Sequence, residues 1–166
     1  SSQLLFESLG QLEAAGSEKS MKDIQFDEER IVEEFLKCDE EEKGDYTDKS
    51  ESSVLVVDDE PVNLQVMVDH LTINNVKVDT AFNGYEALEK IENNVYDMII
   101  LDIMMPRMSG YEACKIIRKK YSIFELPVLM LSAKNNYKEI EMGFDAGAND
   151  YLTKPFEKKE LTSRIN

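Results

Sequence analysis

The fold class can be predicted from VLVVDDEP, residues 54–61, in which four aliphatic residues precede two aspartates. Two further aliphatic runs follow, MIIL at 98–101 and VLML at 128–131. Runs that are apolar at every position are typical of strands covered on both faces, as in a parallel sheet. Weaker strand patterns occupy 76–81 and 149–153. We therefore predict five parallel strands.

The segments between these strands have the apolar spacing of amphipathic helices. Pro61 suits a first helical position. Asn83, Ser109 and Asn136 each stand three residues before a glutamate, as in helix N-terminal capping pairs. The helices are expected at 61–73, 84–93, 110–121, 136–146 and 157–166. This alternation of strands and helices predicts a five-stranded α/β doubly wound domain over residues 53–166.

The composition narrows the class of protein. The 166 residues include 34 acidic and 19 basic side chains, for a net charge of −15. Such acidity argues against nucleic-acid binding through this segment. The longest aliphatic runs have four residues, whereas a membrane-spanning helix needs about twenty apolar residues. Because the start also lacks a signal-peptide pattern, we expect a cytoplasmic protein that makes no membrane contact through this segment.

The excess negative charge is concentrated at the N-terminal end. Residues 1–53 hold 16 acidic and 6 basic residues, whereas residues 54–166 hold 18 and 13. We expect residues 1–52 to form an acidic extension that is partly helical or disordered. Two short helices can form there, and the second, capped by Asp27, is either part of a flexible tether or docks on the folded domain or on a second copy. Their apolar stripes are Leu5, Leu9 and Leu12, and then Ile31, Val32, Phe35 and Leu36.

Polar side chains stand at the carboxyl ends of the predicted strands. Asp58 and Asp59 follow the first strand, and Asp102, Ser132 and Lys154 follow the third, fourth and fifth. In an open parallel sheet these ends meet at one edge, where ligands bind. Taken singly, each residue has an ordinary explanation as a helix cap, a strand end or a solvated lysine. Five of them at the ends of four strands predict a common site.

The chemistry of this set favours phosphoryl transfer. Three neighbouring carboxylates repel one another unless a cation lies among them. Oxygen ligands without His or Cys select Mg²⁺ or Mn²⁺ over zinc. A lysine and a hydroxyl opposite such an ion can hold a tetrahedral anion, and a carboxylate beside them can act as the nucleophile. We therefore expect a phosphoryl group to be transferred to an aspartate.

Four separated motifs share their order and spacing with a known family. They are VLVVDDEP at 54–61, DIMMPRMSG at 102–110, LSA at 131–133 and GANDYLTKPF at 147–156. The intervals are 43 residues from Asp59 to Asp102, 30 from there to Ser132 and 22 from there to Lys154. In these motifs, residues 53–166 resemble a response-regulator receiver domain of two-component and phosphorelay signalling, similar to the chemotaxis regulators. The resemblance implies a flavodoxin-like receiver fold.

The resemblance also implies a role for each site residue. Asp102 would accept a phosphoryl group from a phosphohistidine of a histidine kinase or phosphotransfer protein. Lys154 and Ser132 would contact the phosphoryl oxygens. Asp59 would bind Mg²⁺ directly, and Asp58 largely through water. The implied metal ligands are Asp58, Asp59, Asp102 and the backbone carbonyl of Met104.

A conformational switch is a further implication of the resemblance. Ser132 would turn inward on phosphorylation, and Tyr151 would pack inward after it. A cis peptide bond is expected between Lys154 and Pro155. The surface formed by residues 136–166 is then the expected output face and a candidate homodimer interface.

The lifetime of the phosphorylated state depends on the water that attacks it. In receivers, the side chains two residues beyond the acceptor and two beyond the switch hydroxyl border that water. Here these positions are Met104 and Lys134. Neither is a general base, so we expect slow loss of the phosphoryl group.

Three other interpretations use some of the same residues. A phosphatase of the Asp-nucleophile type would place a second aspartate where Met104 stands, two residues after the nucleophile. A nucleotide-binding enzyme would need a glycine-rich loop after the first strand, and no Gly-x-Gly or Gly-Lys-Ser/Thr sequence occurs. A receiver-like interaction module that is not phosphorylated would not need all five site residues. We expect a phosphoacceptor module, not an enzyme with a substrate of its own.

The architecture of the parent protein can also be anticipated. The acidic leader and the stop inside the last helix lead us to expect a receiver from a multidomain protein. A hybrid histidine kinase or a receiver–cyclase chain would have such an arrangement. The parent protein could then carry an enzymatic domain although the receiver module itself is not an enzyme.

Overall fold

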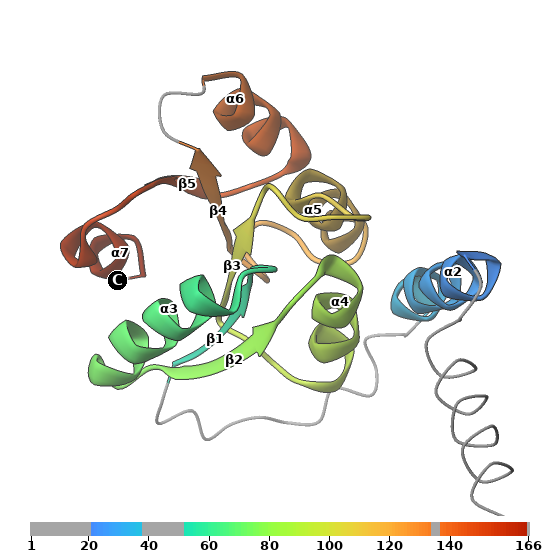
Figure 1. Ribbon diagram of the computed structural model, residues 1–166, viewed down its shortest axis with the longest axis horizontal. Coiled ribbons are helices and arrows are strands. Elements are labelled where there is room, and N and C mark those ends of the chain that lie inside the picture. Colours follow the sequence, from blue (N-terminus) through green and yellow to red (C-terminus); the bar gives the residue numbers. More distant parts are fainter. Residues whose placement is uncertain (1–20, 38–51, 134–136, 166) are drawn as a thin grey trace, which may run out of the picture.

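The computed structural model describes residues 21–37, 52–133 and 137–165, and its centre is a five-stranded parallel sheet (Figure 1). The strands lie in the order β2-β1-β3-β4-β5. Their bounds are β1 Ser53–Val57, β2 Lys77–Ala81, β3 Met98–Asp102, β4 Val128–Ala133 and β5 Asp150–Lys154. The three aliphatic runs form the central strands and the two weaker patterns form the edges. The predicted doubly wound, flavodoxin-like topology is confirmed.

Helices connect the strands and precede them. Their bounds are α2 Met21–Lys37, α3 Pro61–Ile73, α4 Gly84–Asn93, α5 Gly110–Arg118, α6 Tyr137–Ala146 and α7 Lys158–Ile165. The Asn83 side chain caps α4 by accepting from the Glu86 N–H (2.9 Å), and Ser109 caps α5 by accepting from the Glu112 N–H (3.2 Å). The third predicted cap, Asn136, lies outside the described residues. Among the described residues, no helix combines the length and apolarity that a membrane crossing requires.

Helix α5 is shorter than predicted, because it ends at Arg118 and not at residue 121. The Arg118 guanidinium donates to the carbonyls of Ser122, Leu126 and Gly147 at 3.1, 2.8 and 2.7 Å. These bonds hold the chain beyond the helix in a turn toward β4. They run from one side chain to loop carbonyls, one of them 29 residues away, so helical periodicity does not reveal them. Within residues 53–166, the other predicted bounds agree with the structure to within two residues.

Helices lie on both faces of the sheet (Figure 1), and the sheet separates two apolar cores. Helices α3 and α7 cover one face, and α4, α5 and α6 cover the other. On β1, Val54 and Val56 belong to the first core while Leu55 and Val57 belong to the second. Successive side chains of a strand point to opposite faces, which explains why every position of the central runs is apolar.

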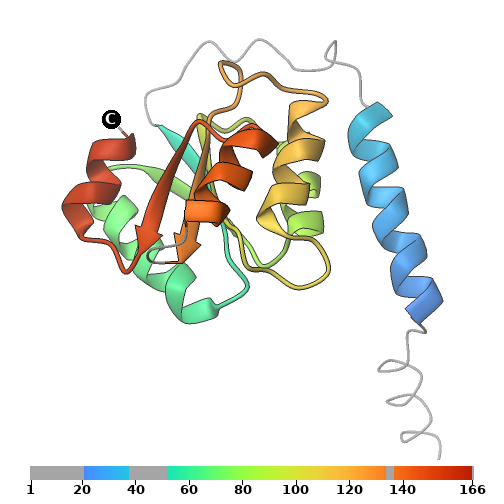
Figure 2. The ribbon, with the colours of Figure 1, turned by 90° about the horizontal axis from the view of Figure 1, so that it is seen from above.

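Helix α2 lies beside α4 and enlarges the second core (Figure 2). Phe35 is fully buried in that core, and Ile31 and Val32 pack against it. Leu36, which was predicted to share this stripe, is 41% exposed. Of the alternatives left open by the sequence, the structure therefore shows the second helix docked on the folded domain. The predicted stripe at residues 5–12 lies outside the described residues.

The prediction that Asp27 caps this helix is wrong. The helix begins at Met21, which places Asp27 in its interior. Residues 21–26 contain neither proline nor glycine, so nothing in them stops the helix from extending upstream. An aspartate caps a helix only where the chain before it leaves the helical conformation.

Candidate functional site

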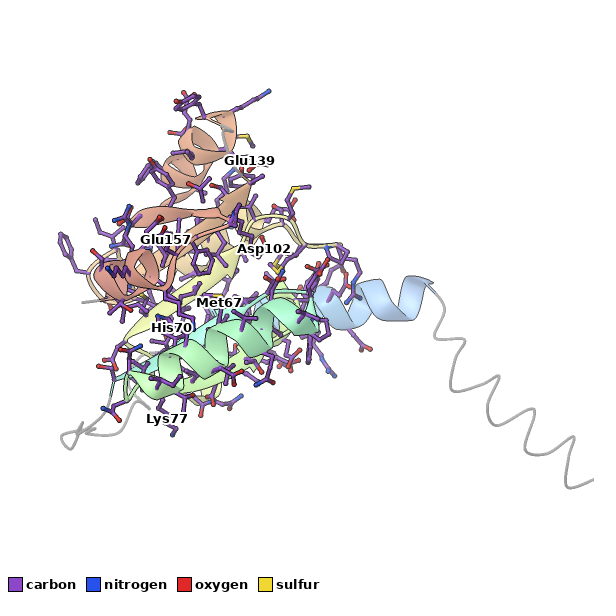
Figure 3. All side chains as sticks on the ribbon, turned by 60° about the vertical axis from the view of Figure 1, so that its left-hand side comes forward. Met67, His70, Lys77, Asp102, Glu139 and Glu157 are labelled. Atoms are coloured by element: carbon purple, nitrogen blue, oxygen red, sulfur yellow. The ribbon has the colours of Figure 1, made fainter. Side chains whose placement is uncertain are left out.

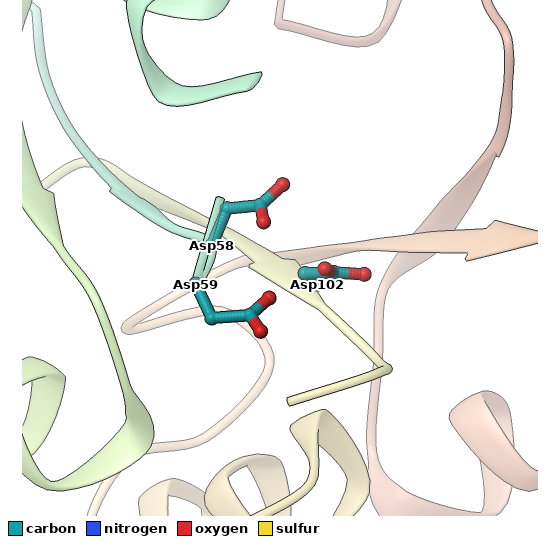
Figure 4. A group of neighbouring side chains, drawn as sticks. All are labelled: Asp58, Asp59 and Asp102. Atoms are coloured by element: carbon teal, nitrogen blue, oxygen red, sulfur yellow. The ribbon is translucent and has the colours of Figure 1, made fainter. Parts of the chain in front are cut away.

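Three aspartates meet at the carboxyl edge of the sheet. Asp58 and Asp59 follow β1 and Asp102 ends β3, and these two strands are neighbours. Figure 3 places Asp102 at the opposite end of the sheet from Lys77, where β2 begins. One oxygen from each carboxylate lies within 4.8 Å of the others, and the three groups face a common space (Figure 4). The structure thus brings together the three carboxylates that the sequence placed at strand ends.

The turn after β1 is shaped by Asp58. Its N–H donates to the carbonyl of Ala81 at the end of β2 (3.1 Å), and its Oδ1 accepts from the Glu60 N–H (3.0 Å). Helix α3 begins directly afterwards at Pro61. Asp58 is fully buried, whereas Asp59 beside it is exposed. One aspartate is therefore fixed inside the site, and its neighbour lies on the solvent side.

Lys154, at the end of β5, supplies the positive charge of the site. Its Nζ lies 3.1 Å from Asp58 Oδ2 and 3.4 Å from Asp102 Oδ2. Burial opposes the charged form of this ammonium, but the two carboxylates outweigh it and raise the pKa of Lys154. The lysine is thus held charged between both aspartates.

The surroundings of Asp102 shift the ionisation of its carboxyl group. Burial, with a further contribution from the negative charge of Asp58, raises its pKa to about 6 although Lys154 and the Met104 N–H act in the opposite direction. Three carboxylates face one lysine here, so negative charge is in excess at the site. A site of this kind favours an added cation with hard oxygen ligands.

Ser132 contributes a buried hydroxyl to the site. Its side chain lies at the end of β4 and is 1% exposed. Within the described part of the chain, its Oγ has no hydrogen-bond partner. A buried polar atom without a partner costs about 1–3 kcal/mol, so this arrangement is unfavourable unless a ligand satisfies the hydroxyl.

A cleft of about 630 Å³ opens over these residues. Its polar side is formed by the aspartates, Ser132 and Lys154. Its apolar side is formed by Val66, Met67, Met104, Pro155 and Phe156. The site is therefore an open cleft with a mixed polar and apolar lining, and its volume is large enough to admit a protein side chain.

Comparison with known proteins decides the family. The family model of the response regulator receiver domain matches residues 54–166. The chain belongs to this family. The receiver resembles Response regulator MprA of Mycobacterium sp. (strain KMS), with 42% identity over 112 residues, which are 68% of this chain and 48% of the relative. The chain spans about half the length of the curated relatives it matches.

Solved structures support the same assignment. The chemotaxis response regulator CheY4 of Vibrio cholerae has a TM-score of 0.65 and 33% identity, over 70% of this chain and 97% of that one. The receiver domain of the Francisella response regulator 1452 has a TM-score of 0.64 and 39% identity, over 69% of this chain and 93% of that one. The fold and the family expected from the four motifs are thus confirmed.

The loop that leaves Asp102 in this receiver is held close to the strand. The Gly110 N–H donates to the Ile103 carbonyl (3.0 Å), which starts α5 directly above the end of β3. A Cβ at Gly110 would lie 2.9 Å from Ile103 Cα, so a larger residue would push the helix away. The Met104 N–H points to Asp102 Oδ1 (3.4 Å), and the Met104 side chain is 69% exposed at the rim of the cleft.

The predicted switch residues, Ser132 and Tyr151, lie on the neighbouring strands β4 and β5. Tyr151 is half-buried and does not line the cleft; its ring packs edge-on against Phe144 of α6, with 5.6 Å between centroids. The peptide bond between Lys154 and Pro155 is cis, as expected. Lys134, the second residue predicted to border the attacking water, lies outside the described residues.

Sequence reasoning missed Arg107, which lies in the same loop. Its guanidinium pairs with Glu28 of α2 and lies over the ring of Tyr85 in α4. The loop after the acceptor is therefore in contact with the N-terminal helix. No motif signals this contact, because it joins residues 79 positions apart across two elements.

Proposed function

We propose that the receiver accepts a phosphoryl group on Asp102 from the phosphohistidine of a histidine kinase or phosphotransfer protein. The observation that carries this proposal is the buried Ser132 hydroxyl, which has no partner in the described chain and lies in the same cleft as Asp102 and Lys154. A phosphoryl group on Asp102 would provide the acceptor oxygens that this hydroxyl lacks. The three residues that would hold one phosphoryl group, Asp102, Ser132 and Lys154, lie on three adjacent strands, which supports the proposal.

The carboxylates are suited to hold Mg²⁺ or Mn²⁺ for this transfer. Asp59 and Asp102 are the expected direct ligands, with the backbone carbonyl of Met104. Both oxygens of Asp58 already have partners, Glu60 N–H and Lys154, so this residue would act mainly through bound water. Bound there, the divalent cation would supply positive charge that offsets the carboxylates and the incoming phosphoryl oxygens.

The transfer itself exchanges one bond for another. A carboxylate oxygen of Asp102 forms a bond to phosphorus as the P–N bond of the phosphohistidine breaks, and the electron pair of that bond stays on the imidazole. Lys154 is placed to balance the charge of the phosphoryl oxygens, because its Nζ is already 3.4 Å from Asp102. The chain contributes positioning and charge, as expected for phosphoryl transfer.

We further propose that phosphorylation is read on the surface formed by residues 136–166. Ser132 and Lys154 would move toward the phosphoryl group, and Tyr151 would follow Ser132. Ser132 and Thr153 are register partners in β4 and β5, so a displacement of the end of β4 would also displace the end of β5. The contact between Tyr151 and Phe144 extends that path to α6. This is also the face proposed for homodimer formation.

The Asp-nucleophile phosphatase receives less support than the receiver. Such an enzyme needs a general acid two residues beyond the nucleophile. Met104 occupies that position, and its thioether can neither donate nor accept a proton at neutral pH. A phosphoryl group on Asp102 would therefore be retained as a signal and not turned over on a substrate.

Phosphorylation by a small donor tests the proposal directly. The chain is incubated with acetyl phosphate and Mg²⁺, and intact mass spectrometry is expected to show addition of one phosphoryl group. Asp102→Asn should remove the addition, and Asp59→Ala should reduce it strongly, whereas the exposed control Asp145→Asn should leave it unchanged. An equal addition on the Asp102→Asn variant would overturn the assignment of the acceptor.

A further inference from the structure

Helix α2 is held on the receiver at two separate places. At its C-terminal end, the ring of Phe35 packs against Tyr121 with 6.3 Å between centroids. Lys120 donates to the Phe35 carbonyl (3.0 Å), and its ammonium lies 4.8 Å from the centre of the Phe35 ring. A basic side chain on the last carbonyls of a helix is a favourable end. This attachment lies at the amino edge of the sheet, far from the phosphorylation site.

The second attachment lies at the opposite edge, next to the site. Glu28 forms an ion pair with Arg107, and both residues line the same surface pocket as Tyr85 of α4. The guanidinium carbon of Arg107 lies 5.8 Å from the centre of the Tyr85 ring. The side chain of Glu28 is 16% exposed and that of Arg107 is 48% exposed, so the pair is partly shielded from water. Three elements, α2, α4 and the loop after β3, therefore meet at one charge pair.

The loop that carries Arg107 also carries the proposed metal ligand. Arg107 follows Met104 by three residues, and its φ of 66° lies in the left-handed region. A non-glycine residue in that region costs on the order of 1 kcal/mol and persists where its surroundings hold it. Glu28 and Tyr85 are the groups that hold the Arg107 side chain, while the Met108 N–H bonded to the Pro106 carbonyl (2.8 Å) closes the turn.

We propose that α2 is an intramolecular positioning element of the receiver, and that the Glu28–Arg107 pair couples its docking to the metal and phosphoryl state of Asp102. The inference rests on the proposed function, since it concerns the same loop and the same carboxylate. While α2 is docked, Glu28 holds the outer end of the loop in the conformation that places Met104 over Asp102. Docking therefore favours metal binding.

Coupling of this kind acts in both directions. If a docked α2 raises the affinity for Mg²⁺, bound Mg²⁺ must raise the stability of docking by the same factor. The acidic segment that precedes the receiver would then report on, and respond to, the state of the site. This is a route between the N-terminal side of the chain and Asp102 that does not pass through residues 136–166.

The affinity for Mg²⁺ in the complete 166-residue chain tests the pair. It is measured by calorimetric titration in wild type, Glu28→Gln and Glu33→Gln. Glu33 is an exposed acid on the same helix, so its variant matches the loss of charge without touching Arg107. Glu28→Gln should weaken Mg²⁺ binding about two- to fivefold relative to Glu33→Gln, which is the range a partly exposed ion pair can contribute. Equal affinities in the two variants would overturn the proposal.

A double-mutant cycle separates positioning from general electrostatics. With Arg107→Gln already present, the additional change Glu28→Gln should act no more strongly than Glu33→Gln does. If Glu28→Gln keeps its full effect without Arg107, its action is not through the loop and the proposal is wrong. Circular dichroism and urea midpoints of each variant identify any loss of affinity that arises from unfolding.

The reverse direction is tested by amide exchange. Addition of Mg²⁺ and beryllofluoride to the wild-type chain should slow exchange in residues 28–37, and Glu28→Gln should abolish that slowing while the amides of residues 102–110 still respond. A response at the site without one in α2 would overturn the coupling and leave the proposed function standing. No response in either region would instead contradict the proposed function.

Discussion

The carboxyl edge of the sheet and the seam between α2 and the receiver are built on opposite principles. At the edge, buried Asp58 and Asp102 share one lysine, and the Ser132 hydroxyl has no partner in the described chain. At the seam, Phe35 is fully buried and its carbonyl is bonded by Lys120. The edge is arranged to bind, and without its ligands it destabilises the fold. The contacts at the seam stabilise the folded state, and they offset part of the unfavourable free energy of the crowded and unpaired polar groups at the edge.

The largest expected effect on stability comes from removing the side chain at the centre of the seam. Phe35→Ala deletes a fully buried ring, and such a deletion usually costs about 3–5 kcal/mol of unfolding free energy. We expect a loss near the lower value, because α2 can move inward or undock and relieve part of the cavity. Urea denaturation followed by circular dichroism measures this change.

Leu36→Ala provides the matched control for Phe35. It removes a neighbouring apolar side chain from the same helical turn, but that side chain is 41% exposed. Changes at such surface positions usually lie within about 0.5 kcal/mol. Equal losses in the two variants would mean that α2 does not dock through Phe35, and the contrast between seam and edge would fail.

The second prediction is a gain in stability instead of a loss, because the substitution removes an unfavourable buried charge at the edge and leaves the packing at the seam intact. Asp102→Asn removes a carboxylate whose pKa burial has raised to about 6. The amide oxygen can still accept from the Met104 N–H, and Lys154 keeps its contact with Asp58. We expect the variant to be more stable than wild type by about 1–3 kcal/mol at pH 7.5 without metal, since each pKa unit corresponds to about 1.4 kcal/mol.

The pH dependence of this gain follows from the raised pKa. The folded wild type holds the Asp102 proton more tightly than the unfolded chain does, so its stability falls as the pH rises from about 4 to above 6. The difference between the variant and wild type should therefore be largest above pH 6 and disappear near pH 4. Mg²⁺ should reduce it at neutral pH by stabilising only wild type. The exposed variant Asp145→Asn should show none of these changes.

The same contrast explains how far the sequence predicts the structure. The edge was predictable because each of its residues stands at the end of a predicted strand, and parallel strands bring their carboxyl ends together. Asp58, Asp102 and Lys154 could therefore be placed near one another before any contact was known. The polar residues of the cleft all stand at or next to strand ends, and the sequence pattern predicts where the strands end.

The seam was not predictable to the same degree. The stripe containing Ile31 and Phe35 indicates an amphipathic helix, but the same stripe would suit a tether, a docked helix or a dimer contact. Its place is decided by Lys120, Tyr121 and Arg107, which belong to loops and have no periodicity that refers to α2. Helical periodicity predicts which face of a helix is buried, but the element that covers this face is determined by tertiary contacts.

The smallest expected effect concerns the rim of the edge and the lifetime of the phosphorylated state. Loss of the phosphoryl group requires a water in line with the phosphorus atom. Met104 lines the cleft with a side chain that is 69% exposed, and its thioether holds a water poorly. With no general base there, the phosphorylated state should last for many minutes or longer in the purified chain with Mg²⁺.

Met104→Asn should shorten this lifetime, because an amide can both donate to and accept from the attacking water. It adds orientation but no base, so we expect about a three- to tenfold acceleration, or about 0.7–1.4 kcal/mol of the barrier. The decay is followed by intact mass after the phosphate donor is removed. Met142→Asn, on the exposed side of α6, is the control and should leave the lifetime unchanged. If both variants decay like wild type, the side chain at position 104 does not control access of water. If Glu28→Gln alters the decay more than Met104→Asn does, the seam and not the rim governs the chemistry at the edge.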